Sequence, residues 1–292
     1  MNREREISHH RVQLSDVRMH YMRAGAGEPV VLLHGWPQNS ASWKEVAPTL
    51  APHYTIVAPD MRGFGFTSKP LEGYDCDTVA NDIYELVQQL GLGPIRLVGH
   101  DWGAAVAYSY AAQHPDDVTA LVLFDMLLPG FGRMEEAMVP RGGDYLWLWH
   151  MGFQAVPDIP EALIAGREEM YLNHFFTTYS YDGDAVTPAR MQHYVEAMRA
   201  PGALRAGLAY YTSYFETAEQ NKRHQQTKLT MPVLAMGGEA ALQDLPRTLI
   251  ETAATDVRGG VIPRCGHWIG EENPGFVADA LLRFFGADQT DQ

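Results

Sequence analysis

The feature that most limits how this chain can fold is the stretch GHDWG at residues 99–103, which joins two different apolar runs. Residues 95–98 (IRLV) predict a buried strand, and the small apolar residues at 104–113 predict a helix. Glycines on both sides of the turn allow the strand and helix backbones to approach closely. This is the pattern of a nucleophile elbow, in which the middle residue, here Asp101, stands at the N-terminus of the helix.

Strand and helix patterns alternate through the first half of the chain. The strand patterns lie at 12–14, 17–21, 29–33, 54–58, 95–98 and 119–124, and the helix patterns at 78–90 and 104–113. This alternation favours a parallel sheet that is covered by helices on both faces. A length of 292 residues fits one large α/β domain or a core with an inserted lid.

The alternation stops after Asp125, and strand patterns return only at 232–236 and 260–263, before a last amphipathic helix at 274–285. The segment between them contains helical patterns rich in aromatic residues. An insertion of this kind predicts a lid over the carboxyl ends of the strands, where open α/β sheets bind ligands. We therefore expect a core of residues 1–127 and 227–292 and a helical cap of residues 128–226.

The aspartate at the elbow determines the class of reaction. A carboxylate that attacks an acyl carbon would form an anhydride, whereas one that attacks a saturated carbon forms an alkyl ester that water can cleave. Asp101 therefore predicts displacement at the carbon of an epoxide, an alkyl halide or an α-halo acid, and it argues against an esterase or a protease.

Several motifs resemble those of epoxide hydrolases and their dehalogenase relatives: HGWPQ at 34–38, GHDWGA at 99–104 and GHW at 266–268. The segments 161–176, 209–221 and 263–268 resemble most closely the Cif-type epoxide hydrolases, named after a secreted bacterial inhibitor of a chloride channel. The resemblance implies the α/β-hydrolase fold, with a mostly parallel eight-stranded sheet, helices on both faces and an inserted helical cap. It also implies conversion of an epoxide to a vicinal diol through a covalent aspartyl ester.

The remaining catalytic groups follow from position and from this resemblance. His267 comes after the last strand pattern, where the fold holds its base, and would direct water onto the ester. Asp125 is the favoured partner of His267, because it matches the position used by the Cif-type relatives; Glu239 and Asp244 remain alternatives. The backbone N–H groups of Trp36 and Trp102 are expected to form the oxyanion hole.

An epoxide oxygen leaves as a basic alkoxide and needs a hydrogen-bond donor. The resemblance assigns this role to Tyr211 and His174, with Tyr210 as the neighbour most easily confused with Tyr211. Aromatic residues and methionines of the cap and the two tryptophans predict an apolar pocket. Its expected lining residues are Trp36, Trp102, Met151, Phe153 and Phe175.

Two other functions remain open. The first is a haloalkane dehalogenase with the same Asp101 and His267, and the second is a non-catalytic receptor on the same fold. A fluoroacetate dehalogenase is disfavoured, because the residues after Asp101 include no arginine to hold a carboxylate.

The net charge of −14 argues against nucleic acids and anionic membranes as partners, which leaves a small epoxide and water. A homodimer is compatible with the sequence, which does not determine the oligomeric state. We see no signal-peptide pattern and no apolar run long enough to span a membrane, so we expect a cytoplasmic protein. The histidines lack metal-ligand spacing, and no phosphate-binding glycine loop follows the first strand, so neither a metal nor a cofactor is expected.

Overall fold

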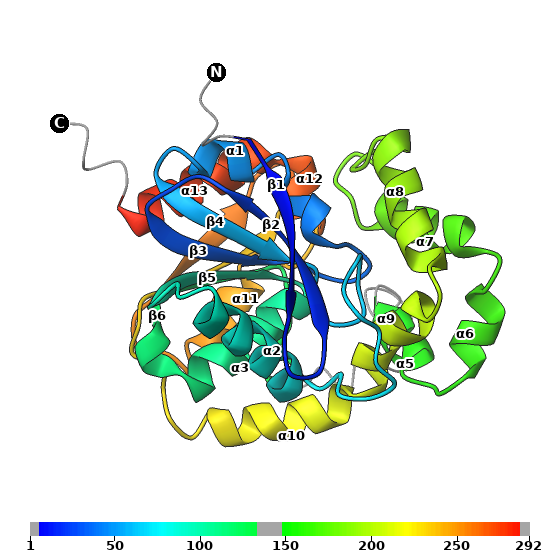
Figure 1. Ribbon diagram of the computed structural model, residues 1–292, viewed down its shortest axis with the longest axis horizontal. Helices are drawn as coiled ribbons and strands as arrows, with labels where there is room; N and C mark the ends of the chain where they lie inside the picture. The colour runs from blue at the N-terminus through cyan, green and yellow to red at the C-terminus, as the bar shows by residue number, and fades with distance from the viewer. Residues whose placement is uncertain (1–5, 133–147, 287–292) are drawn as a thin grey trace.

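Eight strands form one sheet in the order β1-β2-β4-β3-β5-β6-β7-β8 in the computed structural model, which describes residues 6–132 and 148–286 (Figure 1). β1 and β2 pair antiparallel with each other and β2 with β4, and every other pairing is parallel. The strands are β1 (Ser8–Gln13), β2 (Arg18–Ala24), β3 (Glu28–Leu33), β4 (Tyr54–Pro59), β5 (Ile95–His100), β6 (Val118–Phe124), β7 (Val233–Gly238) and β8 (Val257–Ile262).

Both faces of the sheet are buried, which explains the continuous apolar runs of the central strands. Along β3, Val31 and Leu33 pack on one face, whereas Val30 and Leu32 pack on the other. Helices α2 and α3 cover the first face, and α1 and α13 cover the second, so they lie on opposite sides of the sheet (Figure 1). These helices are α1 (Ala47–Leu50), α2 (Cys76–Gln89), α3 (Trp102–Gln113) and α13 (Pro274–Phe285).

Shorter helices fill the loops between these elements. α11 packs against β7 and β8, and α12 packs against α13 and the 3₁₀ helix η2. Their bounds are η2 (Ser40–Trp43), η3 (Pro115–Asp117), α11 (Leu245–Ile250) and α12 (Ile269–Glu272).

The predicted fold class is confirmed, since a mostly parallel eight-stranded sheet carries helices on both faces. The largest local difference is β1, which begins at Ser8 rather than near residue 12. Its residues are polar and mostly exposed, and it pairs with β2 along six positions at the edge of the sheet. An edge strand of this kind has no buried face for its pattern to reveal.

The regular elements that the structure describes between β6 and β7 are helices. Helices α5 to α9 lie together at one side of the sheet (Figure 1). The helices are α5 (Trp149–Gln154), α6 (Ile159–Ile164), α7 (Glu168–Thr178), α8 (Pro188–Arg199), α9 (Ala203–Thr212) and α10 (Tyr214–His224). We call α5 to α9 the helical insertion. Part of the predicted cap, including the aromatic residue Trp147, lies outside the described residues.

Helix α10 falls within the range predicted for the cap, yet it packs against α2 and α3 of the core. The hydroxyl of Thr217 accepts a hydrogen bond from the backbone N–H of Cys76 at 3.1 Å, and the Gln220 amide donates to Asp75 at 2.7 Å. These contacts attach α10, which follows the insertion, to the core.

Within the described ranges, no helix combines the length and the apolar character needed to cross a bilayer.

Gly103 permits the contact between α3 and β3. A Cβ at Gly103 would lie 2.4 Å from the carbonyl oxygen of His34 and 2.6 Å from that of Leu33. Both atoms belong to the backbone, so they cannot move aside as a flexible side chain could. Any side chain here would push the helix away from the sheet.

We therefore expect Gly103→Ala to destabilise the fold by about 3 kcal/mol or more, because the added methyl overlaps backbone atoms. Gly275→Ala is the matched control. Gly275 is also the second residue of a helix, and a Cβ added there would meet no surrounding atom within 4 Å. It should be neutral or stabilising by up to about 1 kcal/mol. Urea unfolding of the two variants measures the difference, and equal stabilities would contradict this account of the elbow.

Candidate active site

Asp101 lies at the turn between β5 and α3 with φ 51° and ψ −128°, a conformation that side-chain-bearing residues rarely adopt. Two backbone hydrogen bonds hold this turn. The N–H of Asp101 donates to the carbonyl of Phe124 at 3.1 Å, and its own carbonyl accepts from Ala104 at 2.8 Å. The side chain is 13% exposed. The turn thus presents the carboxylate at the carboxyl edge of the sheet.

The loop after β3 brings a hydrogen-bond donor to this carboxylate. The backbone N–H of Trp36 donates to Oδ1 of Asp101 at 2.7 Å. Such an approach needs glycine at position 35, because a Cβ there would lie 2.4 Å from the Cβ of Asp101. The backbone N–H of Trp102 also hydrogen-bonds the carboxylate. Both groups predicted for the oxyanion hole therefore lie at Asp101.

His267 faces the other carboxylate oxygen. Its Nε2 lies 3.7 Å from Oδ2 of Asp101, which is too long for a hydrogen bond. Its Nδ1 donates to Oδ2 of Asp125 at 2.6 Å. The imidazole is therefore oriented by Asp125, with Nε2 directed towards Asp101.

Asp125 is fully enclosed at the end of β6, where its side chain is 0% exposed. Its second oxygen, Oδ1, accepts hydrogen bonds from the backbone N–H groups of Gly238 at 2.8 Å and Leu242 at 3.2 Å. The loop after β7 therefore supplies donors to the acid and not the acid itself.

The two alternative acids have other partners. Glu239 is exposed and accepts from the backbone N–H of Arg264 at 2.7 Å. Asp244 pairs with Arg247 at 2.6 Å. Neither residue contacts the imidazole of His267.

The ionisation of Asp101 reflects competing effects. Burial raises its pKa above the usual range of an aspartate, while His267 and the backbone N–H groups of Trp102 and Trp36 oppose that rise.

Burial alone would lower the pKa of His267, but the hydrogen bond and charge of Asp125 and the charge of Asp101 outweigh it. The pKa of His267 is therefore raised, and loss of either negative charge would lower it.

A pocket lies above these three residues, and Tyr211 of α9 is part of its wall. Burial, then the charge of Asp101, raises the pKa of Tyr211 well above its usual value, so the phenol keeps its proton. The side chain of Trp102 hydrogen-bonds this phenol. Tyr210 points away from the pocket and donates to the backbone carbonyl of Arg62 at 2.9 Å. The assignment of Tyr211 rather than Tyr210 to the pocket therefore agrees with the geometry.

The assignment of His174 to the pocket is wrong. His174 is exposed on α7 and does not line the cavity, although its neighbour Phe175 does. The pocket contains His150 of α5 instead, a histidine that sequence reasoning missed. His174 misses the pocket because residues adjacent in a helix point about 100° apart, and Phe175 is the one that faces the cavity. A signal was present, because His150 is the only titratable residue in the aromatic run at 147–153.

His150 packs beside Tyr211 with ring centroids 6.1 Å apart. Its Nδ1 is hydrogen-bonded to the hydroxyl of Tyr179 at 3.2 Å, and Tyr179 also lines the pocket. Three polar side chains, those of Tyr211, His150 and Tyr179, therefore line the pocket.

The structure places some residues of the predicted apolar lining at the pocket and others away from it. Trp36, Met151 and Phe175 line the pocket, but Phe153 and Trp102 do not. Phe153 is half-buried and packs against the ring of Trp149, whereas Trp102 is buried behind Tyr211 with ring centroids 5.3 Å apart. The remaining apolar lining residues are Met126, Leu127, Leu148 and Leu242.

Comparisons with known proteins agree with this geometry. A family model described as alpha/beta hydrolase fold matches residues 28–274. The soluble epoxide hydrolase of Corynebacterium sp. (strain C12) is 39% identical over 284 residues, covering 96% of this chain and 98% of that protein. The structure of the epoxide hydrolase CorEH without ligand is similar, with a TM-score of 0.90, 37% identity and coverage of 97% of this chain and 99% of that one.

A relative with another activity is also similar. The fluoroacetate dehalogenase of Burkholderia sp is 31% identical over 242 residues, covering 79% of this chain and 77% of that protein.

The pairing of Asp125 with His267 predicts a change in the pKa of the imidazole. Asp125→Asn removes the carboxylate that raises this pKa, so the His267 pKa should fall. Glu239→Gln is the control and should leave it unchanged, because Glu239 does not contact the ring. An NMR titration of the histidine ring protons measures both variants. A lower His267 pKa in the Glu239 variant, or an unchanged one in the Asp125 variant, would refute the assignment.

Proposed function

The chain belongs to the epoxide hydrolases of the α/β-hydrolase family, and we propose that Asp101 opens the epoxide ring directly and that His267 hydrolyses the ester so formed. One observation carries this proposal. A carboxylate stands at the elbow with a histidine–aspartate pair on one side and hydroxyl and imidazole donors across the pocket.

In the first step a carboxylate oxygen of Asp101 attacks a ring carbon and the carbon–oxygen bond of the epoxide breaks. Oδ2 is suited to this attack, because Oδ1 is held by the N–H of Trp36. The carboxylate is already a nucleophile and needs no base to remove a proton. This explains why no hydrogen bond to His267 is required at this stage.

The departing oxygen gains negative charge and must receive a proton. Tyr211 and His150 lie in the pocket and are suited to donate to it. The negative charge of Asp101 raises the pKa of Tyr211 in the free enzyme. When Asp101 becomes a neutral ester, that effect disappears, and Tyr211 becomes a better acid as the alkoxide forms. The negative charge of Asp101 is thus transferred to the departing oxygen and its donor. The total charge in the pocket does not change.

In the second step water attacks the ester carbonyl and gives its proton to Nε2 of His267. The same loss of charge on Asp101 lowers the pKa of His267, which favours the neutral imidazole that a base must be. The N–H groups of Trp36 and Trp102 stabilise the oxyanion on the former carboxylate. Collapse of this intermediate expels the ester oxygen, which takes the proton held by His267, and the second proton of the water returns to the group that donated in the first step. The products are a vicinal diol and the ionised Asp101.

The lining of the pocket supports an apolar substrate. Beyond the catalytic and donor groups, it consists of methionine, leucine and aromatic side chains, with Trp268 beside His267. No lysine or arginine lines it among the described residues, so a substrate carboxylate would have no charged partner.

The arrangement of the tryptophans argues against a haloalkane dehalogenase. A halide needs N–H donors in the pocket, and two indoles commonly provide them. The Trp102 side chain is engaged with Tyr211. The indole nitrogen of Trp36 is buried close to Gly207 and has no hydrogen-bond partner among the described residues. At most one indole is therefore free to donate, whereas a halide site commonly uses two.

The covalent step can be tested by trapping. His267→Gln should still form the ester but should hydrolyse it slowly. Mass spectrometry after incubation with styrene oxide should find an adduct of the whole epoxide on the peptide that contains Asp101. Asp101→Asn combined with His267→Gln is the control and should show no adduct. A bromoalkane adduct that forms faster would favour a dehalogenase, and no adduct with any epoxide would favour a receptor.

The donor assignment can be tested with a matched pair of histidine variants. His150→Phe should slow ring opening by about 10²-fold, because a donor to the alkoxide is lost. His174→Phe should change the rate by less than about twofold, because an exposed surface position contributes little. Single-turnover kinetics with an epoxide measures both, and circular dichroism checks that both fold. The opposite ranking would return the role to His174.

A further inference from the structure

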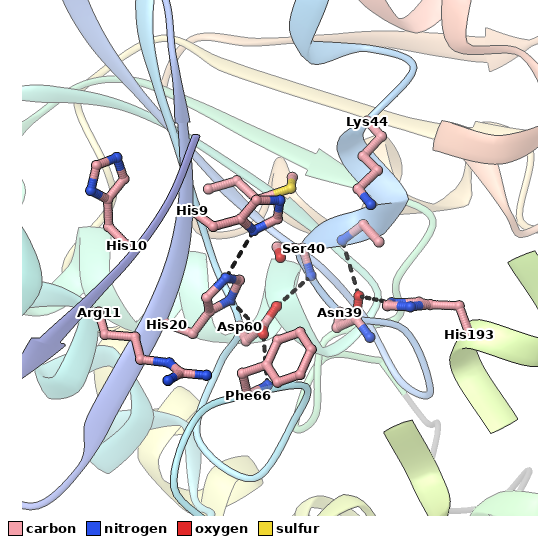
Figure 2. A pocket seen from close by; sticks show the side chains of 12 residues that line it. His9, His10, Arg11, His20, Asn39, Ser40, Lys44, Asp60, Phe66 and His193 are labelled. Carbon is pink, nitrogen blue, oxygen red and sulfur yellow. Dashed lines mark hydrogen bonds and ion pairs between the residues drawn. The ribbon is translucent and has the colours of Figure 1, made fainter. Parts of the chain in front are cut away.

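A second cavity, of about 620 Å³, lies between β1, β2, the turn at 39–44 and helix α8 (Figure 2). Among the residues that the structure describes, it shares no lining residue with the active-site pocket. A cavity of this size can admit a small organic molecule. Nothing in the proposed epoxide chemistry uses it.

The lining of this cavity is basic in a protein whose net charge is −14. Of its twelve lining residues one is acidic, Asp60, and six can carry positive charge. These six are His9, His10, Arg11, His20, Lys44 and His193. Among the residues that the structure describes, no three His, Cys, Asp or Glu side chains are arranged to hold a metal ion, so the histidines do not form a metal site.

Asp60, the one acid among the described lining residues, already accepts hydrogen bonds on both of its carboxylate oxygens. Oδ1 of Asp60 accepts from the backbone N–H of Ser40 at 2.9 Å, and Oδ2 accepts from His20 at 2.7 Å and from the N–H of Phe66 at 2.9 Å. Although burial opposes it, these donors lower the pKa of Asp60 to about 2. Asp60 therefore stays ionised, and both of its oxygens are engaged by donors of the protein.

Asp60 also determines which nitrogens of the neighbouring histidines carry protons. Nδ1 of His20 must donate to the ionised Asp60, so Nε2 of neutral His20 accepts from Nδ1 of His9 at 3.0 Å. The second ring nitrogen of His9 faces the side of the cavity where Lys44 lies (Figure 2). When His9 gains a proton, this nitrogen becomes a donor towards the cavity.

Lys44 is the cation best placed to bind a ligand. Its ammonium group has no hydrogen bond or ion pair with any described residue. Its side chain points towards the part of the cavity where Ser40 and Asn39 lie (Figure 2). Arg11 is exposed, and its guanidinium carbon lies 5.9 Å from the centre of the Phe66 ring. His10 lies on the other side of β1 and is hydrogen-bonded to the hydroxyl of Ser8 (Figure 2). Lys44 and His9 are thus the basic lining groups of the core that are best placed to meet a ligand.

The helical insertion contributes the remaining group. His193 of α8 donates from Nε2 to Oδ1 of Asn39 at 3.2 Å, and Asn39 is almost fully buried in the core. Lys44 and His9 belong to the core. A ligand in this cavity would therefore touch both the core and the insertion.

We propose that this cavity binds a small organic anion, through a phosphate or carboxylate group held between His9 and Lys44 of the core and His193 of the insertion. The proposal is independent of the epoxide chemistry. The cavity supplies unpaired positive charge, ring donors and a buried amide, which are the groups that recognise such oxygens.

Binding should become tighter as the pH falls. Burial and nearby cations lower the pKa of His9 and that of His193, so both rings are mostly neutral near neutral pH. A bound anion favours the charged rings and draws protons onto them. The charged and titratable groups that face these two rings from the surrounding elements are His10, His20, Lys44, Asp60, Arg190 and Glu196.

Isothermal titration calorimetry of the whole protein tests the proposal, with phenyl phosphate and benzoate as probes at constant ionic strength. Either probe should bind at least about tenfold more tightly near pH 6 than near pH 8, with uptake of protons. Tighter binding of phenyl phosphate would indicate a phosphate ligand, and tighter binding of benzoate a carboxylate. Hydrogen exchange should slow in α8 and at 39–44 when the anion binds.

Two substitutions in the cavity and one control elsewhere test whether the anion binds in the cavity. Lys44→Ala should weaken it about tenfold or more, and His193→Gln should reduce its dependence on pH. Lys222→Ala is the control, because it also removes one positive charge but lies on α10, where Lys222 pairs with Glu219. It should leave binding unchanged. The proposal is wrong if neither probe binds near pH 6, or if binding survives both cavity substitutions unaltered.

Discussion

The proposed chemistry depends on one negative charge, the Asp101 carboxylate, held in a largely enclosed pocket. Burial alone would favour its neutral form. Two backbone N–H groups and the imidazole of His267 oppose this and support the nucleophilic form. The same charge affects its neighbours, because it raises the pKa values of Tyr211 and His267. Esterification of Asp101 would therefore change the acidity of both groups in the direction that the following steps need.

The sheet brings these groups together because parallel strands end at one edge. Asp101 follows β5, Asp125 follows β6, and the N–H of Trp36 comes from the loop after β3. The last residue of β7, Gly238, and Leu242 of the loop that follows complete the arrangement by donating to Asp125. A strained conformation at Asp101 is tolerated because the surrounding backbone hydrogen bonds determine it.

The helical insertion has two kinds of contact with the core. Over the active site it contributes the polar groups Tyr211, His150 and Tyr179 together with apolar side chains. On α8 it is attached through Arg190, which pairs with Glu45 and Glu271, and through His193 beside the basic cavity. Occupation of that cavity would add contacts between the two parts without entering the active site.

The sequence alone determined the fold class and indicated the proposed nucleophile and base, because their signals are local. Apolar runs, glycine spacing and the aspartate at the elbow depend on neighbours along the chain, and therefore Asp101, His267 and the sheet could be predicted. Which acid contacts His267, and that His150 rather than His174 enters the pocket, were decided only in three dimensions. Those choices depend on which face of a helix meets the sheet edge, and a change of one residue in a helix rotates a side chain by about 100°. The basic cavity likewise could not be predicted, because it joins side chains from β1, β2, the turn at 39–44 and α8 that no periodicity relates.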